Sequence, residues 1–139
     1  MKESYFWQTV KAHIPEVHWS RIENVAGSGI PDLNGCLNGK EVWIELKMFR
    51  GNRITLRSSQ LVWMTKRLRV LGDVVVMARK DDEIWLINGR QVVEMTSDPV
   101  ISKSTDDKSV SMAPPVESAL KVFHKPLDWE DIRRLLFGA

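Results

Sequence analysis

Cysteine is almost absent from the sequence, with Cys36 alone among 139 residues. A lone cysteine excludes a framework of intrachain disulfides and a zinc site built on several thiolates. Histidine ligands are not indicated either, because His13, His18 and His124 show no ligand-like spacing. The sequence has no internal repeat, no signal peptide and no apolar run of about 18 residues. We therefore expect a soluble protein of the cytoplasm, without a membrane partner.

Net charge is low as well, at +2, and by itself it does not indicate a nucleic-acid partner. The distribution of charge is more informative, because the stretch 47–80 contains nine lysines and arginines but only one acidic residue, Asp73. Such a stretch is often no more than a solvated helix face. Beside a cluster of carboxylates, however, it is the pattern of a protein that grips phosphates. With 43% hydrophobic residues, the chain is long enough to form one domain with a substantial core.

The most informative stretch is 29–47, which contains Asn38-Gly39 between two runs of strand-like residues. Asn-Gly is the strongest short-range signal for a two-residue hairpin turn, because both central residues need a positive φ. Counting outward from this turn, the register places Asp32 opposite Glu45, with Cβ atoms about 5 Å apart. Lys47 lies two residues beyond Glu45 and therefore points to the same face. The hairpin thus brings two carboxylates and an ammonium together.

Two opposed carboxylates in a hairpin destabilise the sheet unless something compensates for their repulsion. Groups at this distance either share a proton or hold a cation. The second strand is otherwise apolar from Val42 to Met48, which is typical of a buried or half-buried strand. Charges within such a strand usually face a cleft or a partner. The alternative is an exposed face on which Glu45 pairs with Lys47 while Asp32 lies in solvent.

Apolar residues recur at helical spacing in three segments, which predicts helices over 3–14, 60–71 and 129–137. Two of these helices carry polar side chains that either enter a site or meet solvent. One is Gln60, and the other is Glu3, which alternatively only favours the helix dipole. The expected caps are Ser58 or Ser59 and Gly72 for the second helix, and Asp128 for the third. The expected buried faces are Leu61, Met64, Leu68 and Leu71 in the second helix, and Trp129, Ile132, Leu135 and Leu136 in the third.

Strands are predicted over 17–24, 74–77 and 83–87 in addition to the hairpin. The β-branched run at 74–77 is the signature of a strand covered on both faces. Segments 91–95 and 116–123 are each expected to be a short helix or a strand. The expected loops are 26–29, a basic loop at 49–57, a turn at Asn88-Gly89 and a long or partly disordered segment at 96–115.

The order of these elements, together with two short motifs, resembles the PD-(D/E)XK nuclease superfamily over about residues 3 to 87. Pro31-Asp32 matches the PD motif and Glu45-Leu46-Lys47 matches the ExK motif. The Gly-Ile-Pro-Asp context is similar to archaeal-type and phage Holliday-junction resolvases and to compact VRR-NUC nucleases. The resemblance implies an α/β fold with a restriction-endonuclease-like core at 1–95, in which helices flank a mixed central β-sheet. A flexible segment at 96–115 and a C-terminal extension at 116–139 would follow, the extension packed on the core or on a dimer partner.

The same resemblance implies a metal site for Mg²⁺, with Mn²⁺ as a substitute. Asp32, Glu45 and the backbone carbonyl of Leu46 would hold the ion, and an acid on the first helix, here Glu3, would join them. Lys47 would position the attacking water, and Gln60 would contact the nucleophile or the phosphate. The residues implied in DNA binding are Arg21, Ser28, Arg50, Arg53, Arg57, Lys66 and Arg67.

The activity implied is that of a metal-dependent endodeoxyribonuclease. Within that class the resemblance favours a Holliday-junction resolvase that makes paired cuts in branched DNA, in the cytoplasm or, if phage-encoded, in that of the host. Two symmetric cuts require two sites, so a homodimer is expected. The alternatives are a compact VRR-NUC-type nuclease acting on flaps, nicks or other DNA, and a non-catalytic DNA-binding module of the same fold. The intact set of Asp32, Glu45 and Lys47 argues against the last of these.

Overall fold

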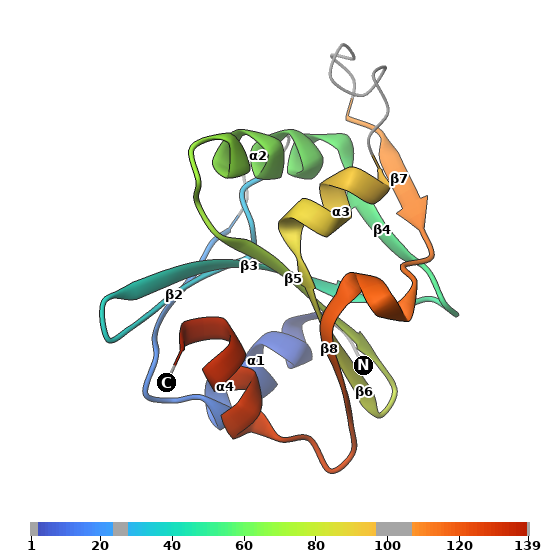
Figure 1. Cartoon of the computed structure of the whole chain (residues 1–139). Helices are drawn as coiled ribbons and strands as arrows, with labels where there is room; N and C mark the ends of the chain where they lie inside the picture. Colours follow the sequence, from blue (N-terminus) through green and yellow to red (C-terminus); the bar gives the residue numbers. More distant parts are fainter. Residues whose placement is uncertain (1–2, 24–27, 97–106, 139) are drawn as a thin grey trace.

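The computed structural model of the chain describes residues 3–23, 28–96 and 107–138. Its centre is a six-stranded sheet with the strand order β1-β2-β3-β5-β6-β8 (Figure 1). The β3–β5 pair is parallel and the other pairs are antiparallel, so the sheet is mixed. The strands are β1 (His18–Arg21), β2 (Leu33–Leu37), β3 (Lys40–Met48), β5 (Val74–Lys80), β6 (Glu83–Asn88) and β8 (Ala119–His124).

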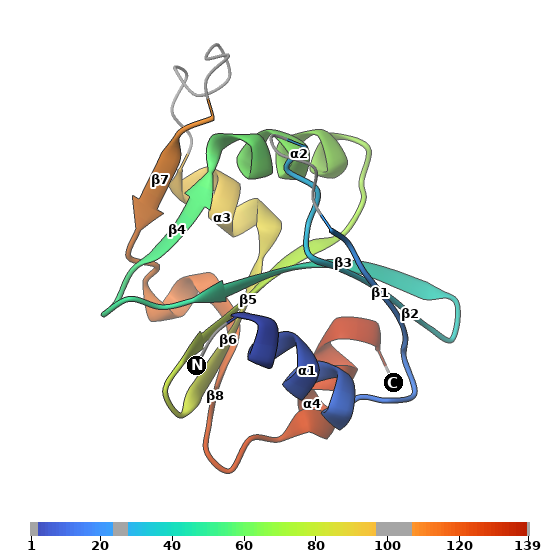
Figure 2. The ribbon, with the colours of Figure 1, turned by 180° about the vertical axis from the view of Figure 1, so that it is seen from behind.

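Helices cover both faces of this sheet (Figures 1 and 2). The helices α1 (Glu3–His13) and α4 (Trp129–Phe137) lie on one face, and α2 (Ser58–Arg69) and α3 (Gly89–Met95) lie on the other. Successive side chains of β5 point to opposite faces, so Val75 packs on the side of α1 and α4, and Val76 packs on the side of α2 and α3. All of β5 except Lys80 is buried, which confirms the prediction of a central strand covered on both faces. The fold is therefore the predicted mixed α/β architecture.

A second, two-stranded sheet departs from the sequence-based expectation. It pairs β4 (Ile54–Arg57) with β7 (Ser109–Met112) in antiparallel fashion. The segment 49–57 was expected to be a loop throughout, and that expectation is wrong for its second half. The same holds for 109–112 within the expected loop 96–115, of which residues 97–106 lie outside the described part of the chain. Ile54, Leu56 and Met112 are buried, so the small sheet adds its own apolar face to the core.

The ends of α2 also differ from the prediction. The helix begins at Ser58, two residues earlier than expected, and its N-cap residue is Arg57. It ends at Arg69, so Leu71 does not belong to the buried stripe and is 87% exposed. The left-handed residue that follows the helix is Leu71, with a φ of 64°, and not Gly72. The amide of Gly72 nevertheless donates to the carbonyl of Arg67 at 2.9 Å and so satisfies a helix-end acceptor.

Two further predictions, of a turn at Asn88-Gly89 and of a helix over 129–137, have different outcomes. The turn predicted at Asn88-Gly89 is wrong: the side chain of Asn88 accepts from the amide of Arg90 at 2.9 Å and caps α3, which begins at Gly89. The helix α4 spans the residues predicted for it, and the Asp128 side chain caps it by accepting from the amide of Asp131. Only its Leu135 departs from the expected buried face, at 40% exposed.

The C-terminal segment joins the central sheet. A short 3-10 turn, η2 (Val116–Ser118), leads into β8, which pairs with β6 along the sheet edge. The helix α4 then returns to bury Ile132 and Leu136 in the same core cluster as Phe6 of α1. The division of the chain at residue 95 stays a prediction, as does packing of the C-terminal segment on a dimer partner. Among the described helices, none is long and apolar enough to cross a membrane.

Candidate active site

The β2–β3 hairpin has the register that its Asn-Gly turn predicts. Leu37 pairs with Lys40 and Cys36 with Glu41, and the ladder continues as far as Leu33 opposite Ile44. Asp32 is the next residue and lies at the start of the hairpin. Its backbone carbonyl accepts from the amide of Ile22 at 2.7 Å, and its carboxylate Oδ2 accepts from the amide of Leu46 at 2.8 Å. These two hydrogen bonds hold Asp32 between Ile22, which follows β1, and the ExK strand.

Glu45 is the most unusual side chain of the hairpin. It is 1% exposed, and neither of its carboxylate oxygens has a hydrogen-bond partner among the described residues. Burial raises its pKa well above 4.5, and the Asp32 carboxyl beside it raises this pKa further. Lys47 acts in the opposite direction, but its effect is smaller. A buried carboxylate without donors costs several kcal/mol unless a proton or a cation compensates for it. The exposed-face alternative for Glu45 is thus wrong.

Lys47 is held beside the carboxylates by the neighbouring helix. Its Nζ donates to Oε1 of Gln60 at 3.2 Å. The same oxygen accepts from the amide of Arg57 at 2.9 Å, at the first turn of α2. Gln60 therefore faces the hairpin and not solvent, and its amide links the start of α2 to the ammonium of Lys47. This contact fixes the position of a positive charge next to two acids.

Glu3 reaches the same place from the start of α1. The residue is exposed as a whole, yet loss of water around its carboxyl raises its pKa above 4.5. Asp32 also raises this pKa, while Lys47 and Arg21 lower it. Glu3 and Lys47 line one hollow, and Arg21 pairs with Leu33, the neighbour of Asp32, so these side chains lie in one region. The structure thus brings Glu3, Asp32, Glu45 and Lys47 together, with Arg21 of β1 beside them.

The loop before the Pro-Asp motif packs against the start of α2. Gly29 has a φ of +69°, and a Cβ added there would lie 2.2 Å from the carbonyl oxygen of Ser59. Only glycine permits both this conformation and this close approach. Ser28 precedes it at the same edge and is half-buried. The glycine therefore holds the Pro31-Asp32 segment against the helix that carries Gln60.

The predicted DNA-binding arginines of the 50–57 segment have different surroundings. Arg50 is exposed at the turn where it pairs with Arg53. Arg53 is exposed as well, but its guanidinium donates to Ser111 Oγ at 2.8 Å and to the Ser111 carbonyl at 3.0 Å. Arg57 forms an ion pair with Asp107 at 2.8 Å. The hydrogen bond that the Arg57 guanidinium donates in this pair, and one from the amide of Ser59, lower the pKa of Asp107 from 3.8 to about 2.

The two basic residues predicted on α2 lie farther from the hairpin carboxylates. Lys66 is exposed and lies six residues beyond Gln60, or about 9 Å along the helix. Arg67 is half-buried and packs its guanidinium over two indole rings, at 4.6 Å from Trp63 and 5.5 Å from Trp43. Packing on these rings accounts for the position of Arg67. DNA binding by both residues stays a prediction.

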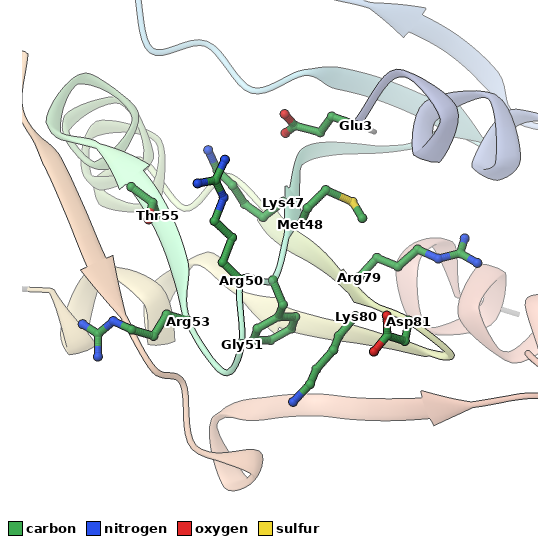
Figure 3. Close-up of a pocket in the computed structure, with 11 residues that line it drawn as sticks. Glu3, Lys47, Met48, Arg50, Gly51, Arg53, Thr55, Arg79, Lys80 and Asp81 are labelled. Carbon is green, nitrogen blue, oxygen red and sulfur yellow. The ribbon is translucent and has the colours of Figure 1, made fainter. Parts of the chain in front are cut away.

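A hollow next to Lys47 contains residues that the sequence analysis did not assign to a site (Figure 3). Phe49, Arg79 and Lys80 line it together with Glu3, Lys47, Arg50 and Arg53. Arg79 and Lys80 end the central strand β5, which runs parallel to β3, with Met48 opposite Arg79. The basic run 47–80 contains both residues, but only the parallel pairing of β3 with β5 places them beside Phe49.

The residues at the hairpin fit a divalent cation. The two oxygens of Glu45 that lack donors and the Asp32 carboxylate beside them are the hard ligands that Mg²⁺ and Mn²⁺ prefer. A backbone carbonyl from Leu46 is of the same chemical type. Among the described residues, no group of three or more His, Cys, Asp and Glu side chains has the arrangement of a complete metal site. Participation of Glu3 as a ligand therefore stays a prediction.

Comparisons with known proteins identify the fold. No protein-family model matches the chain, and no curated protein does. Among solved structures, the fold matches that of Hjc, a Holliday junction resolvase from the archaeal hyperthermophile Archaeoglobus fulgidus. The TM-score is 0.57 at 16% sequence identity, and the match covers 87% of this chain and 92% of that chain. At this identity the likeness shows the fold alone, and it confirms the predicted fold class. The likeness to VRR-NUC and phage nucleases stays a prediction.

Proposed function

We propose that the protein is a metal-dependent endodeoxyribonuclease. The observation that carries the proposal is the buried Glu45 carboxylate, which has no donor among the described residues and lies beside Asp32. Such an arrangement is unfavourable in a purely structural hairpin. It becomes favourable when a cation is bound between the two acids. Likeness of fold to a junction resolvase supports the same proposal at the level of architecture.

Asp32 and Glu45, with the carbonyl of Leu46, would hold Mg²⁺ or Mn²⁺. When bound, such an ion neutralises charge on the scissile phosphate and lowers the pKa of water. Lys47 stabilises the negative charge that develops on the phosphate during attack, and the 3.2 Å contact with Gln60 keeps its ammonium in place. Glu3 places one further carboxylate at the edge of the site.

Phosphate contacts outside the reacting group come from the basic residues around the hairpin. Arg21 and Arg50 are exposed, and neither forms an ion pair with an acid in the described part of the chain. Arg53 is held in place by Ser111, whereas Arg57 must exchange Asp107 for a phosphate. Such contacts set a salt-dependent affinity and the orientation of the DNA, and they carry little sequence preference. Ser28, Lys66 and Arg67 extend the proposed surface along the Gly29 loop and α2.

Branched DNA is the proposed substrate, and a four-way junction is the particular form that the fold favours. Symmetric cutting of a junction requires two sites, so we propose a homodimer. A nuclease acting on flaps or nicks would use the same residues in a monomer. A non-catalytic DNA-binding module would have no use for the buried Glu45 or for the Lys47–Gln60 contact.

Cleavage assays on labelled four-way junction, flap and linear duplex DNA test this proposal. We expect Mg²⁺-dependent cutting that Asp32→Asn or Lys47→Ala abolishes while DNA binding survives. Unchanged cutting by either variant contradicts the mechanism. Paired nicks preferred in the junction support resolution, and preference for the flap favours the second candidate. Sedimentation at micromolar concentration tests the dimer, because a monomer is incompatible with paired symmetric cutting.

A further inference from the structure

A basic hollow opens beside the candidate active site, between the end of β3, the Arg50–Arg53 turn and the β5–β6 turn (Figure 3). Its volume is about 990 Å³, which is large enough for one or two nucleotides. The charged residues that line it are Lys47, Arg50, Arg53, Arg79 and Lys80, against the acids Glu3 and Asp81. Lys47 belongs to both the hollow and the candidate active site, so a strand lying in the hollow leads directly to the reacting groups.

Phe49 supplies an aromatic surface in this hollow. The residue follows β3 directly, and its amide donates to the carbonyl of Arg79 at 2.8 Å. Trp85 supports its ring, with centroids 5.1 Å apart and planes at 59°. Phe49 is half-buried and lines the hollow, and Lys80 Nζ lies 5.9 Å from its ring centroid. An aromatic ring among cations is the arrangement that binds unpaired strands, because a base stacks while its phosphates meet positive charge.

Arg79 precedes Lys80 in β5, so its side chain points to the opposite face of the sheet. The residue is 8% exposed and lines the hollow, and its guanidinium lies 5.7 Å from the ring of Phe6. Its Nη1 is buried and has no hydrogen-bond partner among the described residues. A buried guanidinium with an unsatisfied donor is costly in a folded protein. Because this Nη1 has almost no accessible surface, Arg79 contributes positive charge to the hollow and not a direct contact with an anion.

We propose that this hollow binds one or two unpaired nucleotides of the strand to be cut, with a base on Phe49 and a phosphate at Lys80. The inference rests on the proposed nuclease function and specifies its substrate. The DNA must offer unstacked nucleotides next to the cut, as a branch point or a single-stranded arm does. Continuous duplex can reach the phosphate-binding arginines, but its bases are paired and stacked and so offer no free base to Phe49.

Binding without cleavage tests the proposal. Fluorescence anisotropy in EDTA compares a blunt duplex with the same duplex carrying a single-stranded arm. We expect wild type to prefer the armed DNA, and Phe49→Leu to weaken binding of the armed DNA roughly tenfold while leaving the blunt duplex unchanged. Phe49→Tyr should retain the preference. Lys80→Ala should weaken binding of the armed DNA and lower its salt slope by about one. Lys40→Ala removes the same charge from the exposed hairpin tip and serves as the matched control.

Equal affinity of wild type for the two DNAs overturns the proposal, and so does an equal effect of Phe49→Leu and Phe49→Tyr. Thermal unfolding in the same buffer identifies a variant that is not folded. If Phe49→Leu is unfolded, Lys80→Ala decides, and an unchanged preference in that variant overturns the proposal. Adding Mg²⁺ to the same DNAs reads cleavage separately. If wild type prefers the armed DNA but does not cut it in Mg²⁺, the result contradicts the proposed nuclease function and supports the proposed binding of nucleotides in the hollow.

Discussion

Replacement of Glu45 by glutamine should stabilise the metal-free protein. In wild type the carboxylate is 1% exposed, has no donor among the described residues and lies beside Asp32. A glutamine side chain has nearly the same shape without the charge, and its amide N–H can donate to the Asp32 carboxylate. Removing an unsatisfied buried charge is worth about 1–3 kcal/mol. For a chain of 139 residues, that corresponds to a rise of roughly 3–9 °C in Tm.

The contribution of Glu45 to the stability of the metal-free protein should depend on pH. The folded-state pKa of Glu45 is raised above 4.5, so the folded protein binds this proton more tightly than the unfolded chain does. The stability contributed by Glu45 is therefore fully present below pH 4.5 and is lost as pH rises through the raised pKa. Glu45→Gln removes this loss. The difference in Tm between variant and wild type should consequently grow as pH rises from acidic to mildly alkaline values in EDTA.

Thermal unfolding in EDTA and in excess Mg²⁺ is the assay. Ligand binding to the folded state raises stability with the ratio of ligand concentration to Kd, so wild type should gain Tm in Mg²⁺ and Glu45→Gln should not. Glu41→Gln is the matched control, because Glu41 is exposed on the same strand and its Oε1 acceptor for the Trp43 indole remains. Its free energy of unfolding should stay within about 0.5 kcal/mol of wild type. A destabilised Glu45→Gln in EDTA, or an equal gain from Mg²⁺ in both proteins, would refute the reasoning.

Three further predictions follow from contacts around the hairpin. Gly29→Ala should destabilise the protein by more than about 2 kcal/mol in denaturant unfolding, because φ is +69° and the added Cβ meets Ser59. Gly51→Ala is the control: φ is +59° with nothing within 4 Å of the added Cβ, and the cost should be only about 1 kcal/mol. Equal costs of the two substitutions would contradict the packing of Gly29 against Ser59. Asp107→Asn should free Arg57 and increase the salt slope of DNA binding by about one, and an unchanged slope means that Arg57 does not meet a phosphate. Because the pKa of Asp107 is lowered to about 2, its contribution to stability is present above pH 3.8 and is lost as pH falls toward 2, so acid unfolding of the variant should lack that component. Gln60→Leu should lower kcat about 10- to 100-fold with little change in DNA affinity in single-turnover assays, because Lys47 loses the acceptor that positions it. The variant also removes the acceptor of the Arg57 amide at the start of α2, so thermal unfolding must accompany the assay, and an unchanged kcat would show that the Lys47 contact is incidental.

The parts of the site that sequence could predict are local. The Asn38-Gly39 turn sets the hairpin register by itself, and the register sets which strand residues face Asp32. Asp128 and the amphipathic pattern after it likewise define α4 within a few residues. In each case the physical signal lies within one turn or one element, so distant parts of the chain could not change it.

The parts that sequence could not predict depend on distant pairing. The strand β4 forms because residues 109–112 pair with 54–57, and nothing near Ile54 encodes that partner. The ion pair of Arg57 with Asp107 follows from the same pairing. The basic hollow depends on the parallel crossover from β3 to β5, which sets Phe49 beside Arg79. Composition indicates the basic run, but only the sheet topology shows which of its side chains meet.

Single-turnover cleavage of a labelled four-way junction by wild type and Glu45→Gln, across a Mg²⁺ titration, tests the central claim most directly. Thermal unfolding of the same preparations establishes that both proteins are folded. We predict Mg²⁺-dependent cutting by wild type, and no cutting by a variant that is at least as stable in EDTA and still binds the junction. Cutting by Glu45→Gln at the wild-type rate, or no cutting of any DNA by the folded wild type at any Mg²⁺ concentration, would contradict the assignment of the hairpin as a nuclease site.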